Sequence, residues 1–180
     1  MSILKIVTMG HEALTKEAEP VTDWGDRLEL LVRDMQETML FARGVGLAAN
    51  QVGLPDNLTI IDINAGTSKS ELFVLTNPEI VESSGQVKEE EGCLSIPGFM
   101  VEVVRPEKVV VKYQDERSDE QFIEASGLMA RALCHELDHL NGRLFIENLK
   151  GLKGDMARRK AKKMQRRGEF DDYYEYPDES

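Results

Sequence analysis

The chain has 180 residues, 41% of them hydrophobic, which corresponds to about one domain with a buried core. Its formal net charge of −11 argues against DNA as a partner, and its two cysteines do not suggest a disulfide framework. Because no apolar run approaches membrane-spanning length and the first residues lack the features of a signal peptide, we expect a cytoplasmic protein without a membrane partner.

The first regular element predicted is a helix that ends near Arg43. Its apolar residues Leu28, Leu31 and Met35 recur at helical spacing. The glycine-rich stretch from Gly44 to Gln51 follows, and its G-x-G-x-x-A pattern also occurs in dinucleotide-binding turns. Such turns follow a strand, so the preceding helix argues against nucleotide binding here.

Four segments further along the chain are rich in β-branched or aromatic residues and bounded by turn formers, which predicts strands. They are Leu58 to Ile63, Leu72 to Thr76, Lys108 to Tyr113 and Gln121 to Ala125. The acidic stretch Asp115 to Glu120 joins the last two and predicts a hairpin with a solvated tip. Strands and helices in this arrangement indicate an α+β domain.

The sequence H-E-L-D-H, from His135 to His139, is the most informative part of the chain. Residues four apart lie one turn above each other on a helix, so both histidines can bind one metal ion with Glu136 beside it. Ser126 is a suitable N-cap for this helix, and Asn141-Gly142 is a suitable stop. The pattern therefore predicts a hydrolytic metal site on a helix.

Two histidines do not complete a catalytic zinc or iron site, which normally has three protein ligands and an open position for water. The third ligand must be an Asp, Glu, His or Cys that is distant in sequence. Cys134 directly precedes His135 and points about 100° away from the metal face, so we interpret it as a core residue. Cys93 lies between a glycine and a Pro-Gly pair, at a loop or strand end where a thiolate can face a cavity.

Three stretches, in this order and at these separations, resemble the signature motifs of bacterial peptide deformylases. They are Gly44-Val45-Gly46-Leu47-Ala48-Ala49-Asn50-Gln51, Glu91-Gly92-Cys93-Leu94-Ser95 and His135-Glu136-Leu137-Asp138-His139. The resemblance extends to about Leu149 and implies antiparallel strands packed around a central metal-binding helix, with an N-terminal and a C-terminal helix. It also implies that Cys93 is the third ligand. The activity it implies is removal of the N-formyl group from the initiator methionine of nascent polypeptides, with release of formate.

The residue types predict a mechanism for such a reaction. A divalent metal held by these three ligands lowers the pKa of a bound water toward neutrality. Glu136 would take the proton of this water and return it to the leaving amine. In the family, the residue that matches Gln51 donates its side-chain amide to the developing oxyanion, aided by the backbone N–H at the position of Leu94.

The methionine side chain of the substrate is expected to bind in an apolar slot. Leu128 and Ala132 lie within two turns before His135 on the metal face of the predicted helix. Together with Val45 and Gly46 they are the predicted substrate-binding residues.

Two positions depart from better-known members of the family, so the resemblance does not define the residues at the rim of the pocket. Arg131 stands where an aliphatic residue is common, and Met100 stands where relatives carry a basic residue. Glu91 and Arg105 resemble a family pair that braces the cysteine loop, and an unrelated surface pairing is the alternative.

A thiolate with two imidazoles suits zinc or ferrous iron. Members of the family mostly work with iron, so we expect Fe²⁺ in the cell and Zn²⁺, Ni²⁺ or Co²⁺ as alternatives in purified protein. Two other functions remain open at this point. One is a peptidase of the H-E-x-x-H type, although these usually take a third ligand downstream of the helix. The other is a module with a structural metal, although that needs four protein ligands.

The end of the chain divides into two segments after a catalytic domain of residues 1–152. Residues 153–168 are rich in Lys and Arg and predict a basic helix after Gly154. Residues 169–180 contain six acidic side chains and Pro177, and we expect them to be disordered. In relatives a C-terminal helix docks near the ribosomal exit tunnel, so the resemblance implies that Arg158 to Arg167 contact the ribosome. A solvated helix end, masked by the acidic tail, is the alternative.

Overall fold

The structure, a computed structural model, describes residues 2–171, 173, 174 and 176. Its helices are η1 (Glu12–Thr15), α1 (Asp26–Phe41), η2 (Ala49–Val52), α2 (Gly127–Leu140), η3 (Phe145–Asn148) and α3 (Gly151–Arg166), where η marks a 3₁₀ turn. Its strands are β1 (Gly46–Ala48), β2 (Leu58–Ile61), β3 (Phe73–Ser84), β4 (Val87–Cys93), β5 (Ile96–Arg105), β6 (Lys108–Gln114) and β7 (Glu120–Ser126).

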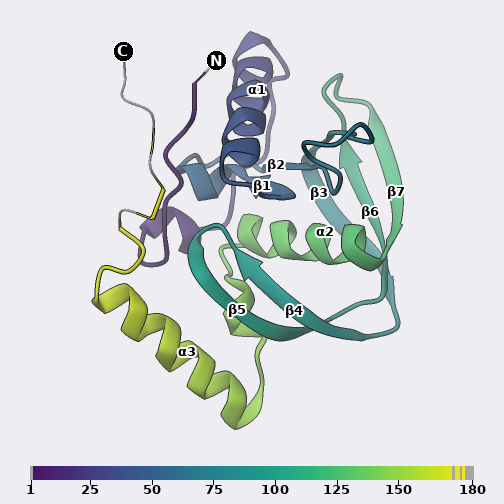
Figure 1. The fold of residues 1–180 in the computed structure, drawn as a ribbon. Coiled ribbons are helices and arrows are strands. Elements are labelled where there is room, and N and C mark those ends of the chain that lie inside the picture. Colours follow the sequence, from purple (N-terminus) through teal and green to yellow (C-terminus); the bar gives the residue numbers. More distant parts are fainter. Residues whose placement is uncertain (1, 172, 175, 177–180) are drawn as a thin grey trace.

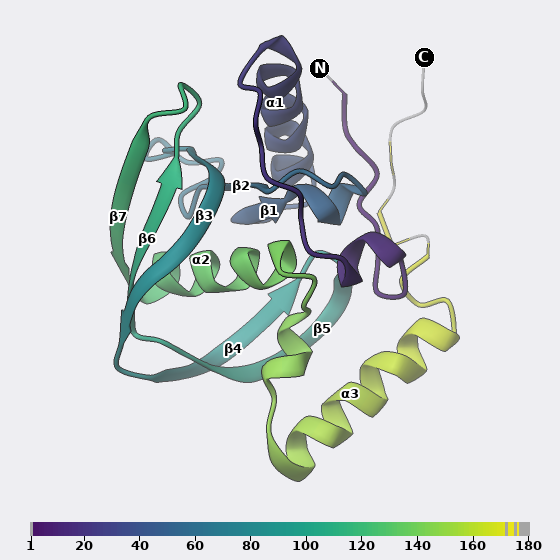
Figure 2. The same ribbon diagram turned by 180° about the vertical axis from the view of Figure 1, so that it is seen from behind.

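The strands form a five-stranded antiparallel sheet, in the order β1-β2-β3-β6-β7, and a separate β4–β5 hairpin. Helix α2 lies between the sheet and the hairpin (Figures 1 and 2). Val109 and Val111 of β6 share one apolar cluster with Leu133 and Leu137 of α2, so hydrophobic burial holds the helix against the sheet. The predicted α+β fold, with antiparallel strands around a central helix, is confirmed.

Most of the predicted elements are present, with shifted ends. Helix α1 ends at Phe41, two residues before Arg43, whose φ of 56° takes the backbone out of the helix. Strand β3 continues to Ser84, well beyond the predicted end at Thr76. The predicted hairpin is formed by β6 and β7 around the acidic turn. Among the described residues, no helix combines the length and the apolar composition needed to cross a membrane.

The sequence reasoning missed the β4–β5 hairpin as a unit, although it placed Cys93 at a loop or strand end. The middle of β4, residues 88–90, is charged and exposed, and it therefore lacks the alternation that marks a half-buried strand. The buried residues Phe99 and Val103 of β5 supply the apolar contacts instead. The pairing shifts register between Gly92 and Cys93, and such bulges re-aim side chains at functional sites.

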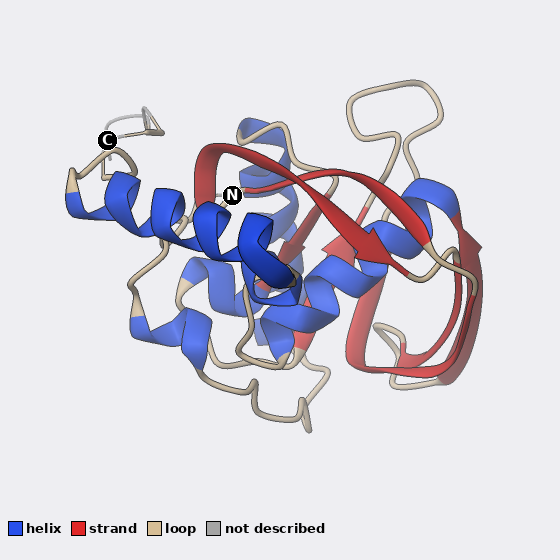
Figure 3. Ribbon diagram, turned by 90° about the horizontal axis from the view of Figure 1, so that it is seen from below, coloured by secondary structure: helices blue, strands red, loops and turns tan. Residues whose placement is uncertain are grey.

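Helix α3 begins at Gly151, earlier than the expected start after Gly154, and lies beside the hairpin at the edge of the molecule (Figure 3). A Cβ atom at Gly154 would lie 2.7 Å from the backbone carbon of Leu149. Glycine therefore lets the first turn of α3 pack directly against the preceding segment.

The segment after Gly168 differs from the expected disorder wherever the structure describes it. Phe170 is buried in the same apolar cluster as Ala161 of α3 and Phe145 of η3. Aromatic rings placed among the acidic residues explain the difference, because their burial offsets the entropy lost on ordering the chain. The expectation for residues 172, 175 and 177–180 lies outside the described residues.

Candidate metal centre and catalytic site

Helix α2 presents the two histidines as predicted. His135 and His139 lie one turn apart, and their Nε2 atoms are 3.2 Å from each other. Ser126 occupies the N-cap in an extended conformation, although among the described residues its side chain caps no backbone amide. Gly142, with a φ of 66°, follows the helix end and confirms the predicted stop.

Cys93 meets these histidines from the end of β4. Its Sγ lies 3.1 Å from Nε2 of His139, and the three potential ligand atoms all lie within 4.8 Å of one another. Ligands of a tetrahedral zinc or iron ion are separated by about 3.3 to 3.6 Å, given metal–ligand bonds of about 2.0 to 2.3 Å. The three donors therefore fit one divalent metal ion. In the part of the chain that the structure describes, they are the one group with this property.

A buried carboxylate orients the first histidine. Oε1 of Glu91 lies 2.5 Å from Nδ1 of His135, and both oxygens of Glu91 accept hydrogen bonds from Arg105, at 3.0 and 2.6 Å. Burial raises the pKa of the Glu91 carboxyl, but the hydrogen bonds from His135 and Arg105 outweigh burial and lower the pKa to about 2. Glu91 and Arg105 thus form a buried pair, as the resemblance implied, rather than an unrelated surface pairing, and the carboxylate stays ionised.

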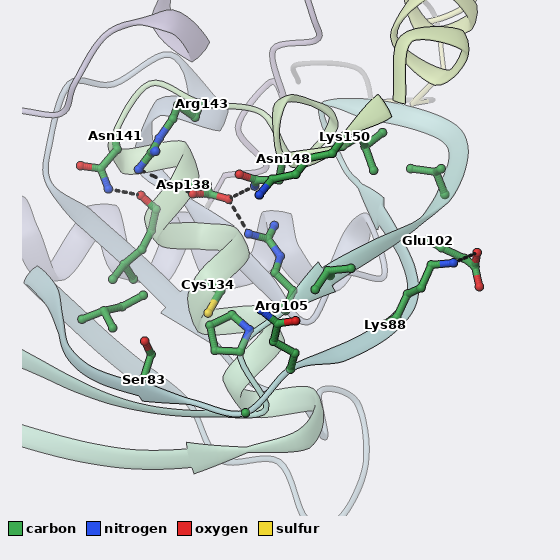
Figure 4. Close-up of a pocket in the computed structure, with 18 of the residues that line it drawn as sticks. Ser83, Lys88, Glu102, Arg105, Cys134, Asp138, Asn141, Arg143, Asn148 and Lys150 are labelled. Atoms are coloured by element: carbon green, nitrogen blue, oxygen red, sulfur yellow. Dashed lines mark hydrogen bonds and ion pairs between the residues drawn. The ribbon is translucent and has the colours of Figure 1, made fainter. Parts of the chain in front are cut away.

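The same arginine also binds α2 directly. Its Nη1 donates to Oδ2 of Asp138 at 2.5 Å, and that oxygen also accepts a hydrogen bond from Asn148 at 2.6 Å (Figure 4). Asp138 is the fourth residue of the H-E-L-D-H motif, so the helix turn that carries both histidines is anchored to β5 and η3. Charged and hydrogen-bonded partners of this kind hold metal-binding side chains in position.

Glu136 points into the site beside the backbone of β1. A Cβ atom at Gly46 would lie 2.6 Å from its Oε1, so only glycine leaves room for the carboxyl here. Oε2 of Glu136 is buried and, within the described residues, has no hydrogen-bond partner. Burial raises the pKa of this carboxyl to about 7. A carboxyl with that pKa can both take up and release a proton near neutral pH.

Gln51 is positioned by the turn of η2. Its Oε1 accepts the N–H of Ala48 at 2.9 Å, which directs Nε2 toward Cys93 Sγ, at 3.7 Å, and Ser95 Oγ, at 3.3 Å. The side chain is almost completely buried. The amide nitrogen of Gln51 therefore faces the metal ligands as a hydrogen-bond donor.

A pocket of about 450 Å³ opens over these groups. Every site residue predicted from the sequence lines it except His139, which is buried beneath it. These lining residues are Val45, Gly46, Gln51, Cys93, Leu94, Leu128, Ala132, His135 and Glu136. Arg131, also at the rim, forms an ion pair with Glu89 and donates to the backbone carbonyl of Glu90.

Two residues of this pocket were missed by the sequence reasoning. Tyr173 and Tyr174 come from the acidic tail, and the hydroxyl of Tyr174 donates to the carbonyl of Leu94 at 2.9 Å. The available signal was the run Tyr173-Tyr174-Glu175-Tyr176, because three tyrosines are unusual in a segment that is otherwise acidic.

A larger hollow of about 1500 Å³ lies on the opposite flank of α2 (Figure 4). Cys134 lines it and belongs to the apolar cluster between the helix and the sheet, so its interpretation as a core residue is confirmed. Burial raises the pKa of the Cys134 thiol to about 11. The smaller pocket is the candidate active site because it contains the metal ligands and the buried carboxyl.

A model of the polypeptide deformylase family matches residues 3–155. The chain belongs to the polypeptide deformylase family. It is a metal-dependent hydrolase that removes the N-formyl group from the initiator methionine of nascent polypeptides and releases formate. Most of α3 and the tail lie beyond the residues matched by the family model.

Individual members of the deformylase family are similar over nearly their whole length. A curated peptide deformylase of Thermodesulfovibrio yellowstonii is 45% identical over 162 residues, which cover 90% of this chain and 98% of the relative. A crystal structure of a peptide deformylase from Legionella pneumophila has 46% identity and a TM-score of 0.84, covering 93% of this chain and 98% of that one. A peptide deformylase from Ehrlichia chaffeensis, solved in complex with actinonin, has 40% identity and a TM-score of 0.81, covering 92% of this chain and 99% of that one.

Proposed function

We propose that Cys93, His135 and His139 hold one divalent metal ion, Fe²⁺ in the cell, at which the formyl group is hydrolysed. The observation that supports this most strongly is the convergence of the three ligands, Glu136 and the Gln51 amide on one pocket. A divalent metal supplies a Lewis acid for the formyl carbonyl and lowers the pKa of water. Zn²⁺, Ni²⁺ or Co²⁺ would fit the same ligands in purified protein.

Glu136 is the general base and acid in this proposal. Its carboxyl takes a proton from the attacking water and delivers it to the amine that leaves with the peptide. Burial opposes the charge on this carboxyl, which favours its uptake of a proton from the water. Among the described residues its Oε2 has no hydrogen-bond partner, which leaves that oxygen free to accept a hydrogen bond from a reacting water.

Two donors stabilise the negative charge that develops on the formyl oxygen. Nε2 of Gln51 is one, since its own Oε1 is engaged by the backbone at Ala48 and cannot turn into the site. The backbone N–H of Leu94, directly after the metal-binding cysteine, is the second donor. Donors fixed before the reaction stabilise the transition state without reorganising during it.

The side chain of the formyl-methionine binds in the slot formed by Val45, Gly46, Leu128 and Ala132. Val45 and Leu128 are large apolar residues that remain exposed around the pocket, and covering them with substrate removes apolar surface from water. The methionine is thus held with its formyl group toward the ligands.

The test is formate release from formyl-Met-Ala-Ser by anaerobically purified protein, with unformylated Met-Ala-Ser as the control. Formate release without cleavage of the control peptide supports a deformylase. Cleavage of Met-Ala-Ser would favour a peptidase of the H-E-x-x-H type, and stoichiometric metal without either activity would favour a structural metal site.

The identity of the native metal needs a separate comparison. Iron-loaded protein should lose activity in air or peroxide, because ferrous iron and the Cys93 thiolate are both oxidisable. Nickel-loaded protein should resist much longer. Equal resistance of the two forms would contradict iron as the labile native metal.

We also propose that the enzyme works in the cytoplasm and docks on the ribosome through α3, with residues 1–152 supplying the metal ligands and the catalytic residues. The exposed cations Arg159, Lys162, Lys163 and Arg166 are available for RNA phosphates. Arg158 has another role, since its guanidinium donates to the carbonyl of Leu149 at 2.6 Å.

Charge reversal tests docking better than truncation, because Ala161 and Phe170 are part of a buried cluster. Replacing both Arg159 and Lys163 with glutamate should weaken ribosome co-sedimentation at low salt while formate release from short peptides continues. Replacing both Lys69 and Arg117 with glutamate is the matched control, because it changes the net charge equally at exposed sites, one in the loop before β3 and one at the tip of the β6–β7 hairpin. Equal co-sedimentation of both variants would refute docking through α3.

A further inference from the structure

The described tyrosines of the tail are held in place on the active-site side of the molecule. Tyr174 donates to the Leu94 carbonyl at 2.9 Å, and the hydroxyl of Tyr176 accepts the N–H of Ile6 at 2.8 Å. The rings of Tyr174 and Tyr176 also pack against Phe41 at the end of α1, with centroids 6.3 and 5.4 Å away. The described tyrosines of the tail thus lie beside the N-terminal segment, away from α3 (Figures 1 and 2).

These contacts make the tail part of the pocket that contains the metal ligands. Tyr173 and Tyr174 line it together with Cys93 and Glu136. The ring of Tyr173 packs against Tyr174 at 5.2 Å and approaches the backbone of Gly98 at the start of β5. One wall of the pocket is therefore built from residues beyond the region 3–155 matched by the family model.

Large apolar side chains are exposed at the rim of the pocket. Four large apolar side chains around it remain exposed, and they are Val45, Leu128, Met100 (58% exposed) and Tyr173 (53% exposed). Val45 and Leu128 belong to the slot for the methionine side chain. Met100 and Tyr173 lie on β5 and the tail, outside that slot, and have no role in the mechanism.

Charge at the rim does not favour an acidic or a basic substrate side chain. Arg131 is neutralised by its ion pair with Glu89. Arg43 and Glu90 bring one charge of each sign to the same rim. Apolar contact is therefore the interaction that this part of the pocket offers to a peptide.

We propose that Tyr173, Tyr174 and Met100 form a subsite for an apolar side chain downstream of the formyl-methionine, so that the tail selects among nascent peptides. This inference rests on the proposed function, because it concerns the substrate of the same site. Tyr173 and Met100 make the contact with the peptide, and Tyr174 positions Tyr173 through its ring and its bond to Leu94.

The test compares kcat/KM for formyl-Met-Leu-Phe and formyl-Met-Ser-Ser in the nickel-loaded full-length protein. The wild type should prefer the apolar peptide. Tyr173→Ala and Met100→Ser should each reduce kcat/KM for formyl-Met-Leu-Phe by roughly fivefold to tenfold, the scale of one buried aromatic or apolar contact, mainly through KM. Both should leave formyl-Met-Ser-Ser within twofold of the wild type.

Phe122→Ala is the matched control, since Phe122 is 59% exposed on β7 and lies outside the pocket. It should change neither value. Tyr174→Phe tests the positioning role: it keeps the ring but loses the bond to Leu94, and it should reduce the preference for the apolar peptide. Thermal unfolding of each variant separates loss of contact from loss of folding.

An equal loss of kcat/KM on both peptides would overturn the proposed subsite. Unchanged kcat/KM values in Tyr173→Ala and Met100→Ser would overturn it as well. The proposal would also be overturned if the variants unfold at a temperature so low that loss of folded protein explains their lower kcat/KM. A wild type that releases no formate from either peptide would instead refute the proposed function, so the two failures are distinguishable.

Discussion

Oε1 of Glu91 lies 2.5 Å from Nδ1 of His135, which joins the β4–β5 hairpin to the helix that carries the metal ligands. With the pKa of the Glu91 carboxyl near 2, this oxygen is a permanent acceptor. Glu91 therefore engages Nδ1 of the imidazole, which leaves Nε2 as the nitrogen that faces His139 and can bind a metal ion. A carboxylate that is not itself a ligand thus orients one of the ligands.

Replacing Glu91 with glutamine should weaken metal binding by about 10- to 100-fold, as is usual when such an outer partner is lost. The measurement is competition with a chelator of known affinity. Glu89→Gln is the control, since Glu89 is a neighbouring glutamate on the same strand whose side chain is exposed. An affinity in Glu91→Gln equal to that of the control would show that the contact does not position His135.

Glu136→Ala should retain one metal per chain and lose at least about 10²-fold in kcat, the scale of general acid–base catalysis. His139→Ala should lose the metal and the activity together, because it removes one of three ligands. Metal analysis and formate release on the same samples distinguish the two classes of variant. A near-normal rate in Glu136→Ala would exclude this carboxyl from proton transfer.

The buried carboxyl of Glu136 should also make the metal-free protein less stable as the pH rises. Burial raises its pKa to about 7 from its ordinary value of 4.5, so the folded state binds the proton more tightly than the unfolded state. The contribution of Glu136 to the free energy of unfolding is therefore most favourable below about pH 4.5, and it is lost as the pH rises from about 4.5 to about 7. Glu136→Gln should therefore be more stable than the wild type at pH 8, by at most about 3 kcal/mol, and should lose this advantage at pH 4. Urea unfolding at both pH values measures the free energy of unfolding of each protein. The same difference between Glu136→Gln and the wild type at pH 4 and pH 8 would contradict a raised pKa for Glu136.

Gln51→Ala should reduce kcat by roughly 10² to 10³, the effect of deleting one oxyanion donor. Metal content should not change, because Nε2 of Gln51 lies 3.7 Å from Cys93 Sγ as a neighbour of the ligand set. Steady-state kinetics over a range of substrate concentrations provide the check. A change restricted to KM would assign Gln51 to substrate positioning instead.

Alkylation should distinguish the two cysteines. Burial raises the pKa of Cys134 to about 11, so at pH 8 only a small fraction is thiolate and iodoacetamide should react with it very slowly. In the metal-free native protein, Cys93 at the floor of the open pocket should be the labelled residue. Peptide mapping by mass spectrometry identifies the site, and preferential labelling of Cys134 would contradict its place in the core.

The parts of the site that depend on local geometry could be predicted from the sequence. Helical spacing places His135, Glu136 and His139 together whatever surrounds them, and Gly142 ends that helix because glycine adopts a positive φ at low cost. The motif around Cys93 supplied the third ligand through resemblance. The local sequence of its strand, with charged residues on the exposed face, did not predict a hairpin.

Contacts between distant segments were decided only by the tertiary structure. The sequence left open whether Glu91 and Arg105 pair, and it did not indicate that Arg105 also binds Asp138. It also suggested disorder where Tyr173 and Tyr174 line the pocket. The physical reason is that composition and periodicity report burial averaged over a segment, whereas the hydrogen bond from Tyr174 to Leu94 joins residues 80 positions apart and exists only once both segments have folded against α1 and β5.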